Sequence, residues 1–174
     1  MQVRVIFALF LFSSVIWANQ WPNLNERNLA GDRLELPELF ADHTWQLVAL
    51  ALSDDQDVGS QQQQQLLQDQ QWIQAQGWSD QWPIYQMPVI AGAPRLVQGL
   101  IRRGLAGSFP EDQDSALVVA IFLANAEQLT TPLGISMTEQ GHWLLIDSQG
   151  MVRWHHNGTF NQEQWQSLMA VVQP

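Results

Sequence analysis

Apolar residues of this chain gather in short runs separated by polar stretches rich in Gly, Pro, Ser and Asp. The runs at 45–52 and 116–123 are almost continuously apolar, which is typical of strands covered by helices on both faces. Polar and apolar residues alternate at 33–36 up to Pro37, which predicts a short edge strand. A further extended segment is predicted at 83–90, between two prolines, and the residues at 23–31 are predicted to be a polar entry segment without a strand.

Helical spacing of apolar residues follows these strands in turn. Ser60 and Asn161 are predicted N-caps, and Pro94 is suited to the first position of a helix. The glutamine run at 61–65 continues into Leu66, so we assign it to a helix rather than to a disordered linker. The predicted helices are 60–76, 94–104, 126–133 and 160–172.

The end of the chain has a clear supersecondary pattern. Strand-like residues at 142–147 and 151–155 flank a turn at 148–150, which predicts a β-hairpin. The hairpin follows parallel strand–helix–strand units and precedes a last helix. This order predicts an α/β fold, a thioredoxin-like three-layer sandwich with a central mixed sheet and a C-terminal hairpin and helix.

The N-terminus has the composition of a targeting segment. A positive start at 1–4 precedes an apolar run at 5–17, which is shorter than a bilayer-spanning helix. We therefore expect residues 1–18 to be a signal peptide cleaved after Ala18 and residues 19–174 to be one thioredoxin-like domain. Ile16 is bulky for its place before the cleavage site, so an uncleaved membrane anchor is the alternative. The expected location is the periplasm, with membrane contact only if the segment is retained.

Charge and cysteine content exclude whole classes of function. The formal net charge is −10, and all cations are arginines, because the chain has no lysine. Nucleic acid is therefore an improbable ligand of so acidic a chain. The chain also has no cysteine, so it has no thiolate for disulfide exchange or peroxide reduction, and no disulfide or lipid attachment site.

Three segments resemble those of a known family. The hairpin Leu-Ile-Asp-Ser-Gln-Gly-Met-Val-Arg-Trp at 145–154, followed by Gly158, is similar to the hairpin of peroxiredoxin-like thioredoxin folds. Its Arg-Trp ending resembles the thioredoxin-like assembly factor of mitochondrial ATP synthase, and the segment 100–105 resembles the basic Arg-Gly segment of that family. The segment 29–37 resembles the opening of peroxiredoxin relatives. The similarity extends from residue 29 to residue 172.

The resemblance implies a non-enzymatic role in which a chaperone helps a newly made membrane subunit to join a complex. Two features of this chain differ from that family. The mitochondrial factor acts in the matrix, whereas this chain is expected to be exported. Where a redox-active cysteine would follow the central strand, the chain has the stretch from Ser53 to Ser60.

Several polar clusters have residue types that occur in catalytic or metal sites. The carboxylates Asp54, Asp55 and Asp57 beside Ser53 lack the glycine and glutamate of an EF-hand, so we expect a solvated loop at a helix N-terminus.

The hairpin histidines were considered as metal ligands. His155 and His156 are adjacent in a strand and point to opposite faces, so we expect them, and His142, to be structural or surface residues. His43 with Ser53 or Ser60 lacks the sequence context of a hydrolase. We therefore expect no catalytic site, metal or cofactor.

Four residues are the predicted partner-binding set: Arg102, Arg103, Arg153 and Trp154. In such an acidic chain, an arginine pair beside an apolar helix face and an Arg-Trp pair on the hairpin would suit a carboxylate-bearing segment of a protein partner. The alternative is that Arg153 pairs internally with Asp147 and that Trp154 belongs to the core.

The leading hypothesis is a redox-inactive protein of the cell envelope that binds a protein partner, for example a subunit of a membrane complex, and assists its assembly. One rival is a cysteine-independent enzyme that uses residues such as His155, Asp54 or Arg153. Another is an envelope-complex subunit with no ligand of its own.

Overall fold

The computed structural model describes residues 19–78 and 80–173. The predicted signal peptide, 1–18, lies outside these residues. The strands are β1 (Leu24–Asn28), β2 (Arg33–Leu36), β3 (Trp45–Leu52), β4 (Ile84–Ala91), β5 (Val119–Leu123), β6 (His142–Asp147) and β7 (Val152–Asn157). The helices are α1 (Gln56–Ala75), α2 (Arg95–Ala106), α3 (Glu127–Leu133) and α4 (Gln162–Val172), with short 3-10 turns at Glu38–Phe40 and Ser115–Leu117.

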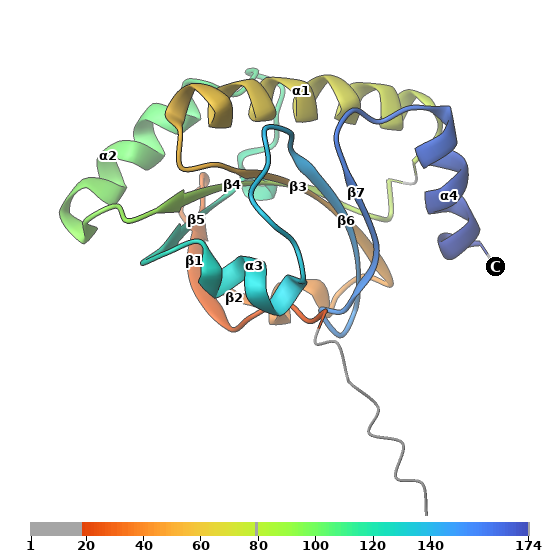
Figure 1. Cartoon of the computed structure of the whole chain (residues 1–174), viewed down its shortest axis with the longest axis horizontal. Coiled ribbons are helices and arrows are strands. Elements are labelled where there is room, and N and C mark those ends of the chain that lie inside the picture. The colour runs from red at the N-terminus through yellow and green to blue at the C-terminus, as the bar shows by residue number, and fades with distance from the viewer. Residues whose placement is uncertain (1–18, 79, 174) are drawn as a thin grey trace, which may run out of the picture.

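The strands form one mixed sheet with the order β2-β1-β5-β4-β3-β6-β7. The pairs β3–β4 and β4–β5 are parallel, whereas β3–β6, β6–β7, β1–β2 and β1–β5 are antiparallel. Helices α1 and α4 cover one face and α3 covers the other (Figure 1). The predicted α/β sandwich, with its late hairpin and last helix, is confirmed.

Strand β3 contributes side chains to both layers of the core. Val48, Leu50 and Leu52 belong to the cluster on the α3 face, and the alternate residues Leu47, Ala49 and Ala51 belong to the cluster beneath α1 and α4. A strand places successive side chains on opposite faces. An almost continuously apolar run is therefore buried on both of its faces, and the predicted bounds 45–52 are confirmed.

The prediction for 23–31 was wrong, because part of that segment forms β1. The strand's inward positions are the polar residues Glu26 and Asn28, 8% and 3% exposed. Their burial is compensated by hydrogen bonds. Glu26 accepts from the N–H of Phe122, and Asn28 accepts from that of Asp32. A hydrophobic pattern has no signal for a strand buried through polar contacts.

The start of the first helix was also predicted wrongly. It begins at Gln56, one turn before the expected Ser60, because Asp55 is the N-cap and its carboxylate accepts the N–H groups of Asp57 and Val58. The acidic stretch therefore starts the helix. The N-cap predicted at Asn161 is confirmed, since its side chain accepts the N–H of Glu163.

Candidate functional site

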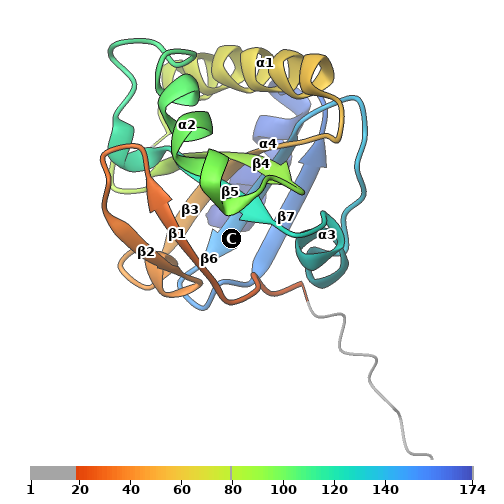
Figure 2. The ribbon, with the colours of Figure 1, turned by 90° about the vertical axis from the view of Figure 1, so that its left-hand side faces the viewer.

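The carboxyl ends of β3, β4 and β5 meet at one edge of the sheet, because these three neighbouring strands are parallel. Ligands of open α/β sheets bind beyond this edge. Here two adjoining cavities, of about 490 and 420 Å³, lie between the amino-terminal half of α1 and helix α2. We call them together the α1–α2 groove. Figures 1 and 2 show the two helices side by side above the sheet.

Gln62 of α1 holds the strand end and a distant loop at this edge. Its amide oxygen accepts the N–H of Leu52 at 2.7 Å, and its nitrogen donates to the carbonyls of Leu52 at 3.2 Å and Thr138 at 2.8 Å. The side chain is only 1% exposed. One glutamine thus satisfies backbone groups where β3 stops and ties the strand end to helix α1.

An acidic loop closes the carboxyl edge. Asp54 and Asp55 line the smaller cavity with Ser53, whose hydroxyl oxygen accepts the N–H of Asp55 at 3.0 Å. Ion pairs in the described residues involve other carboxylates, Glu26 and Asp147, so Asp54 forms no ion pair with any described residue. No three metal-ligating side chains are grouped in residues 19–78 and 80–173.

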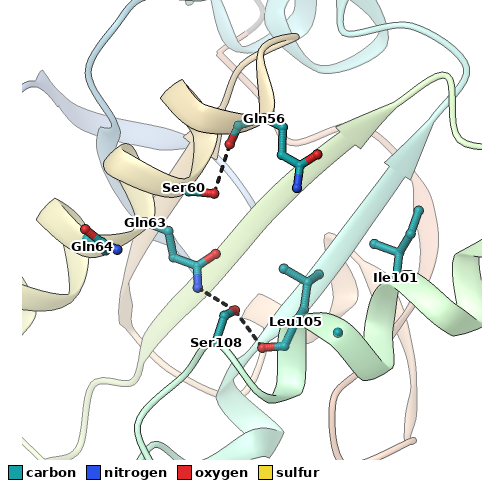
Figure 3. Close-up of a pocket in the computed structure, with 8 residues that line it drawn as sticks. Gln56, Ser60, Gln63, Gln64, Ile101, Leu105 and Ser108 are labelled. Carbon is teal, nitrogen blue, oxygen red and sulfur yellow. Dashed lines mark hydrogen bonds between the residues drawn. The ribbon is translucent and has the colours of Figure 1, made fainter.

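The two walls of the groove differ in chemistry. Figure 3 shows Ile101 and Leu105 pointing from α2 toward α1, while the amides of Gln56 and Gln63 extend from α1 toward α2. The nitrogen of Gln63 donates to the Ser108 hydroxyl at 3.1 Å, and that hydroxyl donates to the Leu105 carbonyl. One wall is therefore aliphatic and the other presents amides.

Helix α2 is strongly amphipathic, yet none of its residues is buried. Leu96 is 98% exposed and Leu100 is 66% exposed. Positions 96 and 100 are one turn apart, and Ile101 and Leu105 lie on the adjoining side of the helix. We call the continuous apolar surface of α2 the α2 face; its members are Leu96, Val97, Leu100, Ile101 and Leu105.

Arg102 attaches α2 to the sheet. Its guanidinium pairs with Glu26 at 3.3 Å and lies 4.6 Å from the ring centroid of Phe122. Burial raises the pKa of Glu26, and the hydrogen bond from the Phe122 N–H and the charge of Arg102 act against that rise. The arginine is thus engaged inside the molecule, while the leucines on the other side of its helix face solvent.

The structure does not bring the four predicted partner-binding residues together. Arg102 and Arg103 lie on α2, and Arg103 donates to the carbonyl of Gly99 in its own helix. Arg153 and Trp154 lie on β7, the last strand at the opposite side of the sheet from β1 and β5.

The hairpin pair has the internal contacts of the alternative interpretation. Arg153 pairs with Asp147 at 2.6 Å, and the indole N–H of Trp154 donates to Ser167. Burial favours the neutral form of Asp147, but hydrogen bonds from the Met151 N–H and from Arg153 outweigh it and lower the pKa of that carboxyl.

The histidines lie as the strand geometry predicts. His142 and His155 stack, with Nδ1 and Nε2 3.0 Å apart, while His156 points to the other face beside Trp154. Burial, and then the neighbouring His155, lowers the pKa of His142 to about 4. His43 precedes β3 and Ser53 follows it, so eight residues of strand, about 26 Å, separate them. They cannot act together.

The sequence predictions did not single out the exposed leucines of α2 or the glutamines that line the groove. Leu96 and Leu100 were assigned to a helix, but nothing in a helical repeat tells whether its apolar side is covered. Gln56 was placed in a turn, and Gln64 was one letter of a repetitive run. An early N-cap at Asp55 was the available signal for including Gln56 in the helix.

Comparison with known proteins identifies the fold. No protein-family model matches the chain, and no curated protein matches it in sequence. Solved structures do match. BsSco, a member of the Sco family of cytochrome c oxidase assembly proteins, superposes with a TM-score of 0.58 at 14% identity, covering 88% of this chain and 92% of that one. The chain has a thioredoxin-like fold.

Two further structures support this assignment. The exposed lipoprotein thioredoxin Etrx1 of Streptococcus pneumoniae matches with a TM-score of 0.53 at 13% identity, covering 85% of this chain and 98% of that one. Copper-bound ScoI of Arabidopsis thaliana matches with a TM-score of 0.56 at 8% identity, covering 87% and 97%. Identities this low carry the fold alone. Since this thioredoxin-like chain has no cysteine, it is not a thiol oxidoreductase.

Proposed function

We propose that this thioredoxin-like protein is a non-enzymatic binding protein of the cell envelope, which holds a protein partner on the α2 face and assists its assembly. The observation that carries the proposal is the exposure of that face. Leu96 is 98% exposed and Leu100 is 66% exposed on a helix without a buried residue. Contiguous exposed apolar surface on a soluble domain marks interaction sites.

The polar groups near the groove support binding rather than catalysis. Asp55 is committed to capping α1, and the hydroxyl of Ser60 donates to the Gln56 carbonyl at 2.9 Å. Neither serine at this edge has a histidine as its hydrogen-bond partner in the structure described. A nucleophile activated by a base needs such a contact.

Export and an assembly role are part of the proposal. The predicted leader at 1–18 supports export, and Etrx1 is described as an exposed lipoprotein. No helix within residues 19–78 and 80–173 has the length and apolarity to cross a bilayer. The Sco family is described as cytochrome c oxidase assembly proteins, and the sequence resembles an assembly factor of another membrane complex.

Site-specific photo-crosslinking in the producing cell tests the proposal. A benzoylphenylalanine at position 100 is expected to form a discrete adduct, and the same residue at Gln166, exposed on α4, is expected to form none. The adduct should vanish when Leu96→Glu is added. Equal adducts from both positions, or an adduct insensitive to Leu96→Glu, would refute a role for the α2 face. The purified protein should reduce neither insulin disulfides nor peroxide above buffer.

A further inference from the structure

We infer that the α1–α2 groove takes an extended segment of the partner protein that carries aliphatic side chains next to a lysine or arginine. The inference rests on the proposed function and names the chemistry of its partner. Three features of the groove point to this ligand: an aliphatic wall, a wall of side-chain amides, and a carboxylate end without a cation of its own.

The aliphatic wall selects the apolar part of the segment. Ile101 and Leu105 line both cavities, and the exposed Leu100 adjoins them on the same helix. Burying one aliphatic side chain against such a wall favours binding by about tenfold or more. Helix α2 has 12 residues and is about 18 Å long, which matches about five residues of extended chain.

The amide wall suits a peptide backbone. The side chains of Gln56 and Gln64 line the larger cavity, and no hydrogen bond joins either amide to another described residue. Their neighbours Gln62 and Gln63 are engaged with backbone and Ser108. An amide offers one acceptor and two donors, which complement the N–H and C=O groups of an extended chain. The groove therefore offers hydrogen bonds that its own helices do not use.

The charge of the groove favours a cation on the segment. Asp54 and Asp55 line the smaller cavity, and no arginine of α2 forms an ion pair with them: Arg102 is paired with Glu26, Arg103 donates along its helix, and Arg95 has no ion pair with a described residue. The whole chain carries a formal net charge of −10. A basic segment is therefore attracted from a distance and held at the acidic end. An acidic segment would be repelled.

Fluorescence anisotropy with three labelled eight-residue peptides tests the inference on the purified protein. One peptide alternates leucine and lysine, the second replaces each lysine with glutamate, and the third replaces each leucine with serine. We expect the leucine–lysine peptide to bind at least about tenfold more tightly than either of the others. Equal binding of the glutamate peptide would overturn the charge argument, and equal binding of the serine peptide would overturn the apolar one.

Matched variants locate the binding. Leu100→Ser should weaken the leucine–lysine peptide about tenfold, while Met137→Ser, at another exposed apolar residue, should change it less than twofold. Asp54→Asn should weaken it about threefold and reduce its salt dependence, while Asp112→Asn, in an exposed loop elsewhere, should not. Equal effects of Asp54→Asn and Asp112→Asn would mean nonspecific attraction to an acidic protein and would overturn the inference.

The result is separable from the proposed function. If the peptides fail to discriminate while the position-100 adduct persists in cells, the partner chemistry is wrong and the α2 face still binds. Sedimentation analysis covers another occupant. If the protein dimerises and Leu100→Ser makes it monomeric, the α2 face takes a second copy of this chain and the inference is overturned.

Discussion

Helices α1 and α2 border the same groove, and the burial of each is the opposite of what its composition suggests. Helix α1 is rich in glutamine, yet Gln62, Gln63 and Gln70 are buried in it. Helix α2 has the stronger apolar face and buries no residue. The difference teaches that hydrogen-bond partners and neighbouring elements decide burial in this fold, since a polar side chain is stable inside when its donors and acceptors are satisfied.

One buried amide of α1, that of Gln70, links the helix to β4 and to a distant loop. Gln86 of β4 donates to Gln70 at 2.7 Å, and Gln70 donates to Gln113 at 3.2 Å. The preceding residue, Asp69, accepts the N–H of Phe160 and lies 3.4 Å from the indole nitrogen of Trp143. Burial raises the pKa of Asp69, and the hydrogen bond from Phe160 opposes the rise. Helix α1 is thus attached to the sheet through polar as well as apolar contacts.

The sharpest test of the comparison pairs one leucine from each helix. Leu66 of α1 is 1% exposed and packs beneath the helix. Leu66→Ala should lower the free energy of unfolding by about 3 kcal/mol through lost burial and a cavity. Leu100→Ala should change it by less than about 0.5 kcal/mol, because the side chain is already in water. Urea denaturation measures both, and similar losses would show that α2 packs more tightly than described.

Acidification tests what happens when a buried polar group is not fully satisfied. His142 is 1% exposed and its Nε2 has no hydrogen bond in the structure described. Its pKa is lowered from 6.5 to about 4, so the unfolded chain takes up the proton first. The stability that depends on neutral His142 is fully present above pH 6.5. It is lost as the pH falls to about 4, which lowers the free energy of unfolding by up to about 3 kcal/mol.

His142→Gln removes this contribution together with the contact to His155, whose pKa burial also lowers, while Glu26 and Asp69, whose pKa values are raised, titrate with the opposite sign in both proteins. The variant should show a shallower loss of thermal stability between pH 6.5 and 4 than the parent. Identical pH profiles would contradict the assignment.

Gln62→Ala should lower the free energy of unfolding by about 2 kcal/mol, because buried backbone groups at the end of β3 lose their hydrogen-bond partner. Gln61→Ala is the matched control. Gln61 is the preceding, exposed residue of the same helix, so its replacement should be neutral or slightly stabilising. Chemical denaturation of both variants shows whether the loss of stability belongs to the hydrogen bonds of Gln62 or follows from replacing any glutamine of α1.

Arg102→Ala should have the smallest global effect and a local one on α2. Loss of the contacts to Glu26 and Phe122 should cost about 1 kcal/mol. Hydrogen exchange should accelerate in 95–106 while α1 keeps its protection. Arg103→Ala, which removes only a contact within the helix, should leave both unchanged. Equal acceleration in the two variants would mean that Arg102 does not hold the helix.

Patterns of apolar residues predicted most of the fold correctly. The bounds of β2 and β3 were predicted correctly, and those of β6 and β7, α3 and α4 closely, because most of these elements bury apolar residues and the hairpin strands flank a turn. The early start of α1 and the strand β1 were missed, since Asp55, Glu26 and Asn28 act through hydrogen bonds, which a pattern of apolar residues does not reveal.

By itself the sequence determined the fold class, the absence of thiol chemistry and the acidic charge. These properties depend on residue types and on local periodicity, both of which can be read directly from the sequence. Only the tertiary structure decided that Arg102 and Arg153 are paired internally, that three glutamines of α1 are buried, and that Leu96 and Leu100 face solvent. Each of those outcomes depends on which distant residue lies within a few ångströms, and that is set by how the elements pack.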